Sequence, residues 1–242
     1  TPARQFIERR GGEVRTGTAA RITCGARGGL QGSATRVITK DQSIDAAAIV
    51  CAVPWHALPD VLDDAPPPLA AVVANAHHTA ASPIVTVNLW LDRAVTGESV
   101  TGLPGRTMQW VFDKRMLFGG QASHLSLVSS GAGAIVGLSN EELVAIALGE
   151  VRAALPAAAA AAVQRAVVVR EKRATFSVAP GQPPRPGTET GVPGLFLAGD
   201  WIETGLPATI EGAVVSGHRA ADAVVNWRDG PRWRGNAEPN PH

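Results

Sequence analysis

The segment from Leu195 to Ala221 constrains the fold of this chain more than any other. A short apolar run, 194–199, ends at Gly199-Asp200, and a glycine-containing loop follows it. An apolar stripe over 207–225 then predicts a helix. This order of strand, tight turn, loop and helix leaves backbone N–H groups free at the start of the helix, where a ligand can approach.

Each part of this segment offers a different contact to a ligand. Gly199 has no side chain, so a ligand can lie close to its backbone, and the carboxylate of Asp200 can accept hydrogen bonds from hydroxyl groups such as those of a ribityl chain. The N–H groups around Ala208 to Ile210 favour negative charge, which a reduced flavin carries at its N1–C2=O edge. A plain strand–loop–helix with an exposed aspartate explains the same residues, and both interpretations stay open on this basis.

Composition excludes several classes of protein. The 242 residues are 45% hydrophobic and 18% charged, which predicts a buried core and excludes a disordered chain. The net charge of +1 predicts no nucleic-acid partner, and no apolar run reaches the roughly 18 residues of a membrane span. Cys24, Cys51 and the pair His77-His78 lack metal-ligand spacing, so we expect no metal site and two core thiols in a reducing compartment.

The remaining pattern predicts a mixed α/β chain. The apolar alternation predicts strands at 13–18, 20–24, 34–39, 44–53, 82–91, 109–112, 124–129 and 166–170, with a tight turn over 25–32. Helices are predicted at 56–62, from the capping box at Ser139 to Pro156, and over the alanine run 157–162. The proline cluster at 63–68 predicts a domain crossing, and 227–242 predicts a flexible tail.

The segment after Leu197 resembles the C-terminal flavin motif of the flavin amine oxidase and phytoene desaturase superfamily. The run Gly-Asp-Trp-x-x-Thr-Gly-Leu-Pro-Ala-Thr-Ile-Glu-Gly-Ala, which begins at Gly199, is most similar to the squalene-associated FAD-dependent desaturases, or hydroxysqualene dehydroxylases. Further matching pieces occur in the family's order at 52–58, 82–93, 109–113 and 170–176, so the resemblance spans about residues 1–225.

This resemblance implies a glutathione-reductase-like FAD-binding fold with an inserted substrate domain made of a sheet and helices. Residues 1–62 and 165–226 would then form the FAD-binding domain, and 63–164 the substrate-binding domain. The family opens with Gly-x-Gly-x-x-Gly, which this chain lacks. The glycines of 131–137 have the wrong spacing and are interpreted as an ordinary loop, so we expect the ADP-binding half to precede Thr1.

The resemblance also implies the site residues. FAD would contact Gly199, Asp200, Trp201, Pro207, Ala208, Thr209 and Ile210, with Val14 on the adenine side and Pro54 and Trp55 near the flavin. Simple sheet packing of Val14, and a capped helix start at Pro54, remain open alternatives. Trp90, Trp110 and Phe112 would line an apolar tunnel for a long isoprenoid, or else form a sheet core. No side chain is a convincing general acid, and Glu203 is the nearest candidate in sequence to the flavin.

The implied reaction is reductive removal of the hydroxyl group of hydroxysqualene, giving squalene for hopanoid or carotenoid synthesis. A phytoene-type desaturase is the first alternative, and a flavin amine oxidase is the second, although the absence of tyrosine weakens it. An inactive fragment or an interaction domain is the alternative outside enzymes, and this fragment is expected to be inactive alone. A lipophilic isoprenoid substrate further implies a cytoplasmic protein with peripheral contact to the inner face of the membrane.

Overall fold

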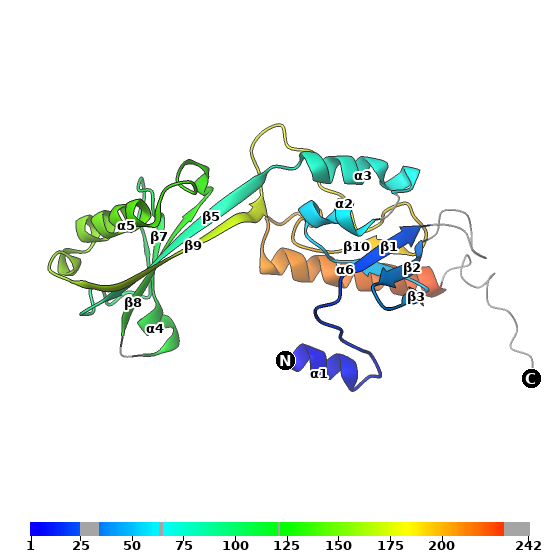
Figure 1. Cartoon of the computed structure of the whole chain (residues 1–242), viewed down its shortest axis with the longest axis horizontal. Helices are drawn as coiled ribbons and strands as arrows, with labels where there is room; N and C mark the ends of the chain where they lie inside the picture. The colour runs from blue at the N-terminus through cyan, green and yellow to red at the C-terminus, as the bar shows by residue number, and fades with distance from the viewer. Residues whose placement is uncertain (25–33, 63–64, 121, 230–242) are drawn as a thin grey trace, which may run out of the picture. The chain divides into compact units, whose positions relative to one another are not determined.

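The computed structural model describes residues 1–24, 34–62, 65–120 and 122–229, so the predicted turn over 25–32 lies outside the described residues. The chain divides into two compact units (Figure 1). Unit 1 contains Thr1–Thr79 and Pro180–His242, and unit 2 contains Ala80–Ala179. Unit 2 is therefore inserted in the sequence of unit 1, and each unit is described by itself below.

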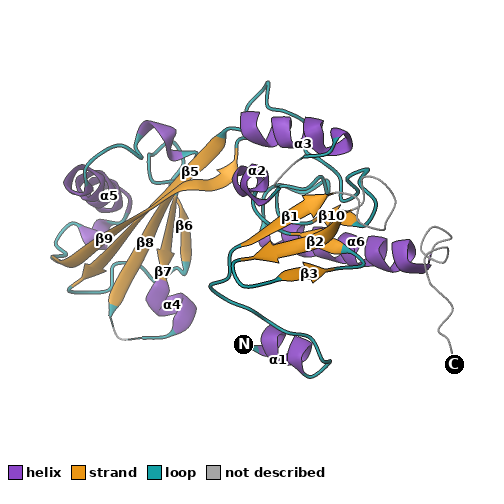
Figure 2. Ribbon diagram, turned by 45° about the vertical axis from the view of Figure 1, so that its right-hand side comes forward, coloured by secondary structure: helices purple, strands orange, loops and turns teal. Residues whose placement is uncertain are grey.

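Unit 1 combines two small sheets with helices. Strands β1, β2 and β3 form an antiparallel sheet, and β4 pairs in parallel with β10, on which helix α6 packs (Figure 2). The parallel pair joins segments distant in sequence, with Ile49 opposite Leu195 and Cys51 opposite Leu197. The elements are α1 (Pro2–Glu8), β1 (Ala20–Cys24), β2 (Ala34–Thr39), β3 (Ser43–Asp45), β4 (Ile49–Cys51), η1 (Trp55–Ala57), α2 (Leu58–Val61), α3 (Pro67–His78), β10 (Leu195–Leu197) and α6 (Ile210–Asp229).

Unit 2 is a five-stranded antiparallel sheet with the strand order β6-β7-β8-β5-β9. Its capping box at Ser139 is present as the sequence predicts, with both reciprocal hydrogen bonds to Glu142, and it opens helix α5. The elements are β5 (Ala81–Leu91), β6 (Val100–Gly102), β7 (Trp110–Asp113), α4 (Lys114–Phe118), β8 (Ser123–Ser130), η2 (Ala132–Ala134), α5 (Asn140–Ala154), η3 (Pro156–Ala158) and β9 (Val163–Phe176).

The two faces of this sheet have different surroundings, because side chains alternate along each strand. We call the first the covered face: Val85, Val87, Leu89, Leu125 and Leu127 point there and pack with α5 and η2 in the core of the unit. We call the second the open face. Its side chains are half-buried or exposed except Ser126, and by register they include those of Ile84, Thr86, Asn88, Trp90, Trp110, Phe112, His124, Ser126, Val128, Arg165, Val167 and Val169.

Several predicted elements differ from the observed ones. The expected strand 13–18 is irregular, and the expected strand 44–53 is two strands, because the chain leaves β3 after Asp45 to reach a different sheet at Ile49. Only Pro156–Ala158 of the alanine region is helical, as a single 3-10 turn. The interpretation of 131–137 as a loop holds apart from the short turn η2, which Gly131 opens with a positive φ of 64°.

The ends of larger elements also differ from expectation. Helix α6 begins at Ile210 rather than Pro207 and continues to Asp229, so 227–229 are helical and not part of a tail. The proline cluster begins helix α3, since proline fits the first turn of a helix, where its missing N–H is not needed. The compact unit 2 runs over 80–179 rather than 63–164, because α3 belongs to unit 1 and β9 pairs with β5 along its whole length.

Candidate functional site

The end of strand β10 is a tight turn that only glycine fits well. Gly199 has a φ of 136°, a conformation that other residues rarely adopt. A Cβ atom built on Gly199 would lie 3.1 Å from Cδ1 of Trp201 and 3.3 Å from its Nε1. The Gly199 N–H donates to Ser216 Oγ at 2.8 Å, so the turn is also fixed to the buried side of α6. The turn is thus held from both sides.

Trp201, expected at the flavin edge, is a buried structural contact. Its side chain is 4% exposed, and its indole Nε1 donates to the carbonyl oxygen of Val53 at 3.0 Å. Val53 follows β4, so this bond joins the ends of the two parallel strands. The Ala198 N–H, which donates to Cys51 O at 3.0 Å, adds a second link at the same edge.

Asp200 and the start of α6 carry the groups that are free for a ligand. Asp200 is partly buried, and within the described part of the chain its carboxylate has no hydrogen-bond partner. Thr209 caps the helix by accepting the Gly212 N–H at 3.0 Å, which leaves the N–H groups of Ile210 and Glu211 ahead of the first helical bonds. The Ile210 side chain is 87% exposed, and those of Pro207 and Thr209 are also exposed, whereas Ala208 is partly buried.

Glu203 is an ion-pair partner rather than a free acid. Its carboxylate pairs with the guanidinium of Arg185 at 2.7 and 2.9 Å and accepts the Gly205 N–H at 2.7 Å. The Gly205 hydrogen bond, followed by the charge and hydrogen bonds of Arg185, lowers the pKa of Glu203. A carboxyl group held in its ionised form is a poor proton donor, so the structure gives no support to Glu203 as a general acid.

Two arginines that the sequence analysis did not select hold the loop over 203–206 in place. Arg185 donates to the Leu206 carbonyl at 2.8 Å, besides its pair with Glu203. Arg219 of α6 donates to the carbonyl oxygens of Glu203 and Thr204 at 2.9 and 3.3 Å. Of the two, only Arg219 could have been selected from the sequence as a neighbour of the loop, because it lies on the predicted helix that follows the loop.

The remaining residues expected near FAD make contacts within unit 1. The Val14 carbonyl accepts from the Arg4 guanidinium at 3.4 Å, so this residue contacts α1. Pro54 caps η1, and Trp55 is buried, with its Nε1 donating to Thr79 O at 3.2 Å. Trp55 therefore fixes the start of α2 against the end of α3.

The three residues expected to line an apolar tunnel share one face in unit 2. Trp90, Trp110 and Phe112 all belong to the open face, and Trp110 is 47% exposed. They do not form the sheet core, which lies on the covered face. The interpretation as sheet core is therefore wrong, because all three lie at alternate positions to the core residues Leu89, Leu91 and Val111.

A match to a family model decides the family of the chain. The model described as flavin containing amine oxidoreductase matches residues 1–225. The chain belongs to this family. Membership confirms the flavin-family resemblance and makes FAD the expected cofactor of the chain.

The curated relatives of this flavin-family chain include isoprenoid enzymes. A hydroxysqualene dehydroxylase of Rhodopseudomonas palustris is 41% identical over 128 residues, which cover 52% of this chain and 28% of that protein. Another, from Sinorhizobium fredii, is 32% identical over 233 residues, which cover 93% of this chain and 49% of that protein. A 15-cis-phytoene desaturase of Synechococcus elongatus is 25% identical over 210 residues, which cover 83% of this chain and 44% of that protein. The chain thus spans about half the length, or less, of these relatives.

Solved structures agree with the α/β FAD-binding fold of the family. A cyclohexylamine oxidase from Brevibacterium oxydans gives a TM-score of 0.67 at 15% identity, covering 92% of this chain and 50% of its own. An oxidoreductase from Methanosarcina mazei gives a TM-score of 0.66 at 19% identity, and the match covers 90% of this chain and 52% of that one. At these identities the likeness shows the fold alone.

The loop after β10 fits the flavin that this family carries. Gly199 has no side chain to block approach to its backbone, and Asp200 supplies a carboxylate without a partner among the described residues. The first N–H groups of α6 supply donors and a positive helix end. Donors, an acceptor for hydroxyl groups and close backbone approach are together the contacts that a flavin and its ribityl chain need.

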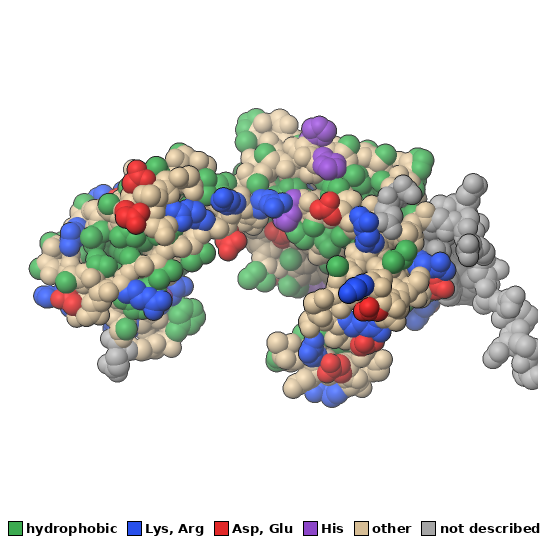
Figure 3. Space-filling view, in the orientation of Figure 1, with side chains coloured by type: hydrophobic (Ala, Val, Ile, Leu, Met, Phe, Trp, Pro, Cys, Tyr) green, Lys and Arg blue, Asp and Glu red, His purple; other side chains and the backbone are tan. Residues whose placement is uncertain are grey.

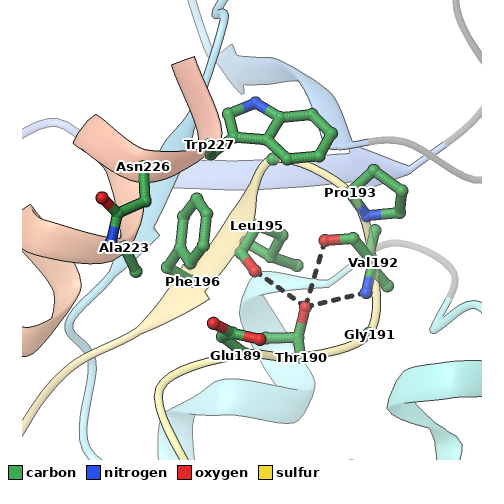
Figure 4. Close-up of a pocket in the computed structure, with 11 residues that line it drawn as sticks. Glu189, Thr190, Gly191, Val192, Pro193, Leu195, Phe196, Ala223, Asn226 and Trp227 are labelled. Carbon is green, nitrogen blue, oxygen red and sulfur yellow. Dashed lines mark hydrogen bonds between the residues drawn. The ribbon is translucent and has the colours of Figure 1, made fainter. Parts of the chain in front are cut away.

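A separate pocket of about 300 Å³ lies at the other end of β10, away from Gly199 (Figure 4). Thr190 shapes it, since its Oγ1 donates to Leu195 O at 2.8 Å and accepts the Val192 N–H at 3.1 Å. Asn226 and Trp227 line it from the end of α6, where the sequence analysis predicted a tail for Trp227. Its lining residues are Glu189, Thr190, Gly191, Val192, Pro193, Gly194, Leu195, Phe196, Ala223, Asn226 and Trp227.

Three further observations concern metals, thiols and membrane spans. Within the described residues, no group of three or more His, Cys, Asp or Glu side chains could hold a metal ion. Cys24 and Cys51 are both free thiols, and burial raises the pKa of each. None of the helices in the described ranges has the length and apolar character needed to cross a bilayer.

Proposed function

We propose that this chain acts in the FAD-dependent reductive dehydroxylation of hydroxysqualene to squalene, a step of hopanoid or carotenoid synthesis. The observation that carries the proposal is the extent of one match. The hydroxysqualene dehydroxylase of Sinorhizobium fredii aligns with 93% of the chain at 32% identity, against 83% at 25% for the phytoene desaturase.

We assign the two units different roles in this reaction. Unit 1 would hold the flavin through Gly199, Asp200 and the first turn of α6, with Trp201 and Ser216 fixing the turn. Unit 2 would bind the isoprenoid chain on its open face through Trp90, Trp110 and Phe112. Large aromatic side chains that are half-buried or exposed rather than enclosed supply apolar area that a long hydrocarbon can cover.

The reaction requires one hydride and one proton. Reduced FAD, when bound, supplies the hydride. The C–O bond of the substrate breaks, a C–H bond forms at the same carbon, and the departing oxygen takes a proton to leave as water. Glu203 does not supply this proton in our proposal, because its pair with Arg185 lowers its pKa and keeps it ionised.

The test is a conversion assay on the purified flavoprotein. The protein is incubated without oxygen with hydroxysqualene and a chemical reductant, and the products are separated by gas chromatography with mass detection. We expect squalene. The same protein given phytoene and a quinone oxidant should return phytoene unchanged. A desaturated product from phytoene, with hydroxysqualene recovered intact, would replace the proposal with the desaturase function.

We propose also that helix α4 carries the peripheral membrane contact. Met116, Leu117 and Phe118 are exposed, with Phe118 at 77%, and hydrophobic side chains gather beside basic ones at this end of unit 2 (Figure 3). The Lys114 ammonium lies 5.2 Å from the Phe118 ring. An exposed apolar tip beside a positive charge is suited to an anionic lipid surface.

Vesicle sedimentation tests this contact. Binding to vesicles of phosphatidylglycerol and phosphatidylcholine should fall about ten-fold for the variant Phe118→Ser, because a large apolar side chain no longer enters the bilayer. Val178→Ser is the control, since Val178 is as exposed but lies outside α4. If Phe118→Ser binds the vesicles as tightly as the unchanged protein does, the proposal that α4 contacts the membrane is contradicted.

A further inference from the structure

A stack of three side chains crosses the open face of unit 2. His124, Trp90 and Arg165 lie directly opposite one another on the adjacent strands β8, β5 and β9. The His124 and Trp90 rings are stacked, with centroids 4.1 Å apart and an angle of 15° between their planes. The Cζ atom of the Arg165 guanidinium lies 4.8 Å from the centroid of the Trp90 ring. The histidine ring is therefore held in a fixed orientation by its neighbours.

Asn88 and Ser126, which lie opposite each other next to Trp90 and His124 on the open face, determine which ring nitrogen of His124 carries the proton. The Oδ1 atom of Asn88 lies 3.0 Å from His124 Nε2 and also accepts the hydroxyl of Ser126. An amide oxygen only accepts hydrogen bonds, so Nε2 is the protonated nitrogen of a neutral ring and Nδ1 carries a lone pair. Within the described part of the chain, neither His124 Nδ1 nor the Asn88 amide nitrogen has a hydrogen-bond partner.

The charges around His124 favour this neutral form. Burial lowers its pKa, and the positive charges of Lys114 and Arg165 lower it further, whereas Asp113 alone acts in the opposite direction. The ring is therefore neutral at pH 7, and Nδ1 is an acceptor. Together with the Asn88 amide, the site offers one acceptor and one donor, which is the pattern that a hydroxyl group complements.

The side chains beyond Asn88, away from His124, are mostly apolar. Phe112 and Val167 lie in the same row as Asn88, and the next row holds Trp110, Val128 and Val169 together with one polar residue, Thr86. Trp110 and Val169 are exposed, so this part of the open face is accessible to a ligand. A donor and acceptor pair beside a row of aromatic and branched aliphatic side chains fits a ligand that is a hydrocarbon except at one oxygen.

We propose that the open face binds a long apolar alcohol, with its hydroxyl group donating to His124 Nδ1 and accepting from the Asn88 amide. This inference deepens the function proposed above, on which it rests for the isoprenoid class. His124 and Asn88 become the residues that recognise the hydroxyl of the substrate, and Ser126 becomes a positioning residue that holds the Asn88 oxygen.

The test compares an isoprenoid alcohol with its hydrocarbon. Equilibrium binding of farnesol and of farnesene to the purified flavoprotein is measured in the absence of reductant, so that no turnover occurs. We expect farnesol to bind at least ten-fold more tightly. The variant His124→Phe keeps a flat ring on Trp90 but lacks the acceptor, and should reduce this preference about ten-fold while leaving the affinity for farnesene unchanged.

Other variants separate a polar contact from a change in shape. Asn88→Leu should abolish the preference as His124→Phe does, and it provides the test if one of the two folds poorly. Ser126→Ala should reduce the preference about three-fold, and its matched control is Ser129→Ala, a buried serine of the same strand that points to the covered face. An equal affinity of the unchanged protein for both ligands, or a preference that His124→Phe and Asn88→Leu leave intact, would overturn the inference.

The outcomes also separate this inference from the proposed function. A His124-dependent preference for farnesol without squalene formation would keep the alcohol site and reject the dehydroxylase function. Squalene formation with no effect of His124 or Asn88 on the preference would keep the function and reject this site.

Discussion

The loop after β10 in unit 1 and the open face of unit 2 are both candidate ligand sites, but they are built in different ways. The loop is made of residues close in sequence, from Gly199 to Ser216, and its ligand groups are mostly backbone. The open face is made of side chains from four strands, which only the register of the sheet brings together. The first kind of site is specified by a short motif, and the second by the packing of a whole unit.

The difference between the two faces of unit 2 gives the largest expected effect. Leu127 and Val128 are neighbours on β8 that point to the covered and open faces. Leu127→Ala should lower the free energy of unfolding by about 2–5 kcal/mol, because it leaves a cavity in the core. Val128→Ala should cost less than about 1 kcal/mol, since its site is already in part open to solvent. Urea unfolding measures both, and equal losses would show that the open face is a packed core.

The backbone of the loop gives the next effect. Gly199→Ala should cost about 1–3 kcal/mol, because the positive φ is strained and the new Cβ would meet the Trp201 ring. Flavin retained after gel filtration should fall in parallel. Gly187→Ala is the control in the same unit, since no atom lies near that site and its φ is not positive. A Gly199→Ala protein with full flavin content would show that close backbone approach is not required.

The serine beneath the turn gives a smaller effect. Ser216 is fully buried and accepts the Gly199 N–H, so Ser216→Ala leaves that donor without a partner and should cost about 1–3 kcal/mol. Gly217→Ala, the next residue on the exposed side of α6, should be neutral or stabilise the helix by up to about 1 kcal/mol. Thermal unfolding distinguishes them, and a loss as large for Gly217→Ala as for Ser216→Ala would contradict the role of this hydrogen bond.

The pH dependence at Glu203 gives the smallest effect. Its pKa is lowered in the folded chain, so its contribution to stability is present above the ordinary glutamate pKa of about 4.3 and is lost as the pH falls through the lowered value. Because Glu203 is 51% exposed, Glu203→Gln should cost less than about 1 kcal/mol at pH 7 and nothing in acid. Thermal unfolding from pH 7 to pH 3 measures this, and a loss that grows in acid would contradict the assignment.

Local patterns predicted much of the fold. The capping box at Ser139 and the strands near 82–91 and 124–129 are confirmed, because alternation and capping act within a few residues. Helix α3 was missed, since its prolines were interpreted only as a break. The division of 44–53 was missed because the partner of β4 lies far away at β10, which no local pattern reveals.

The site residues follow the same rule. Gly199 and Asp200 were selected from their motif, and they lie where the strand and helix order predicts. The ion pair of Glu203 was not predicted, because Arg185 lies in a proline-rich connection without a periodic pattern. His124 and Asn88 were not selected, since a histidine and an asparagine 36 positions apart meet only when β5 and β8 pair in this register.

The pairing of β4 with β10 has a consequence for synthesis of the chain on the ribosome. Strand β4 is made first, and all of unit 2 follows before β10 appears. At ordinary translation speed this delay is on the order of ten seconds, long enough for unit 2 to fold alone. During that time the edge of β4 at Ile49 and Cys51 lacks β10, so this edge is open to wrong pairing until residues 195–197 have been made.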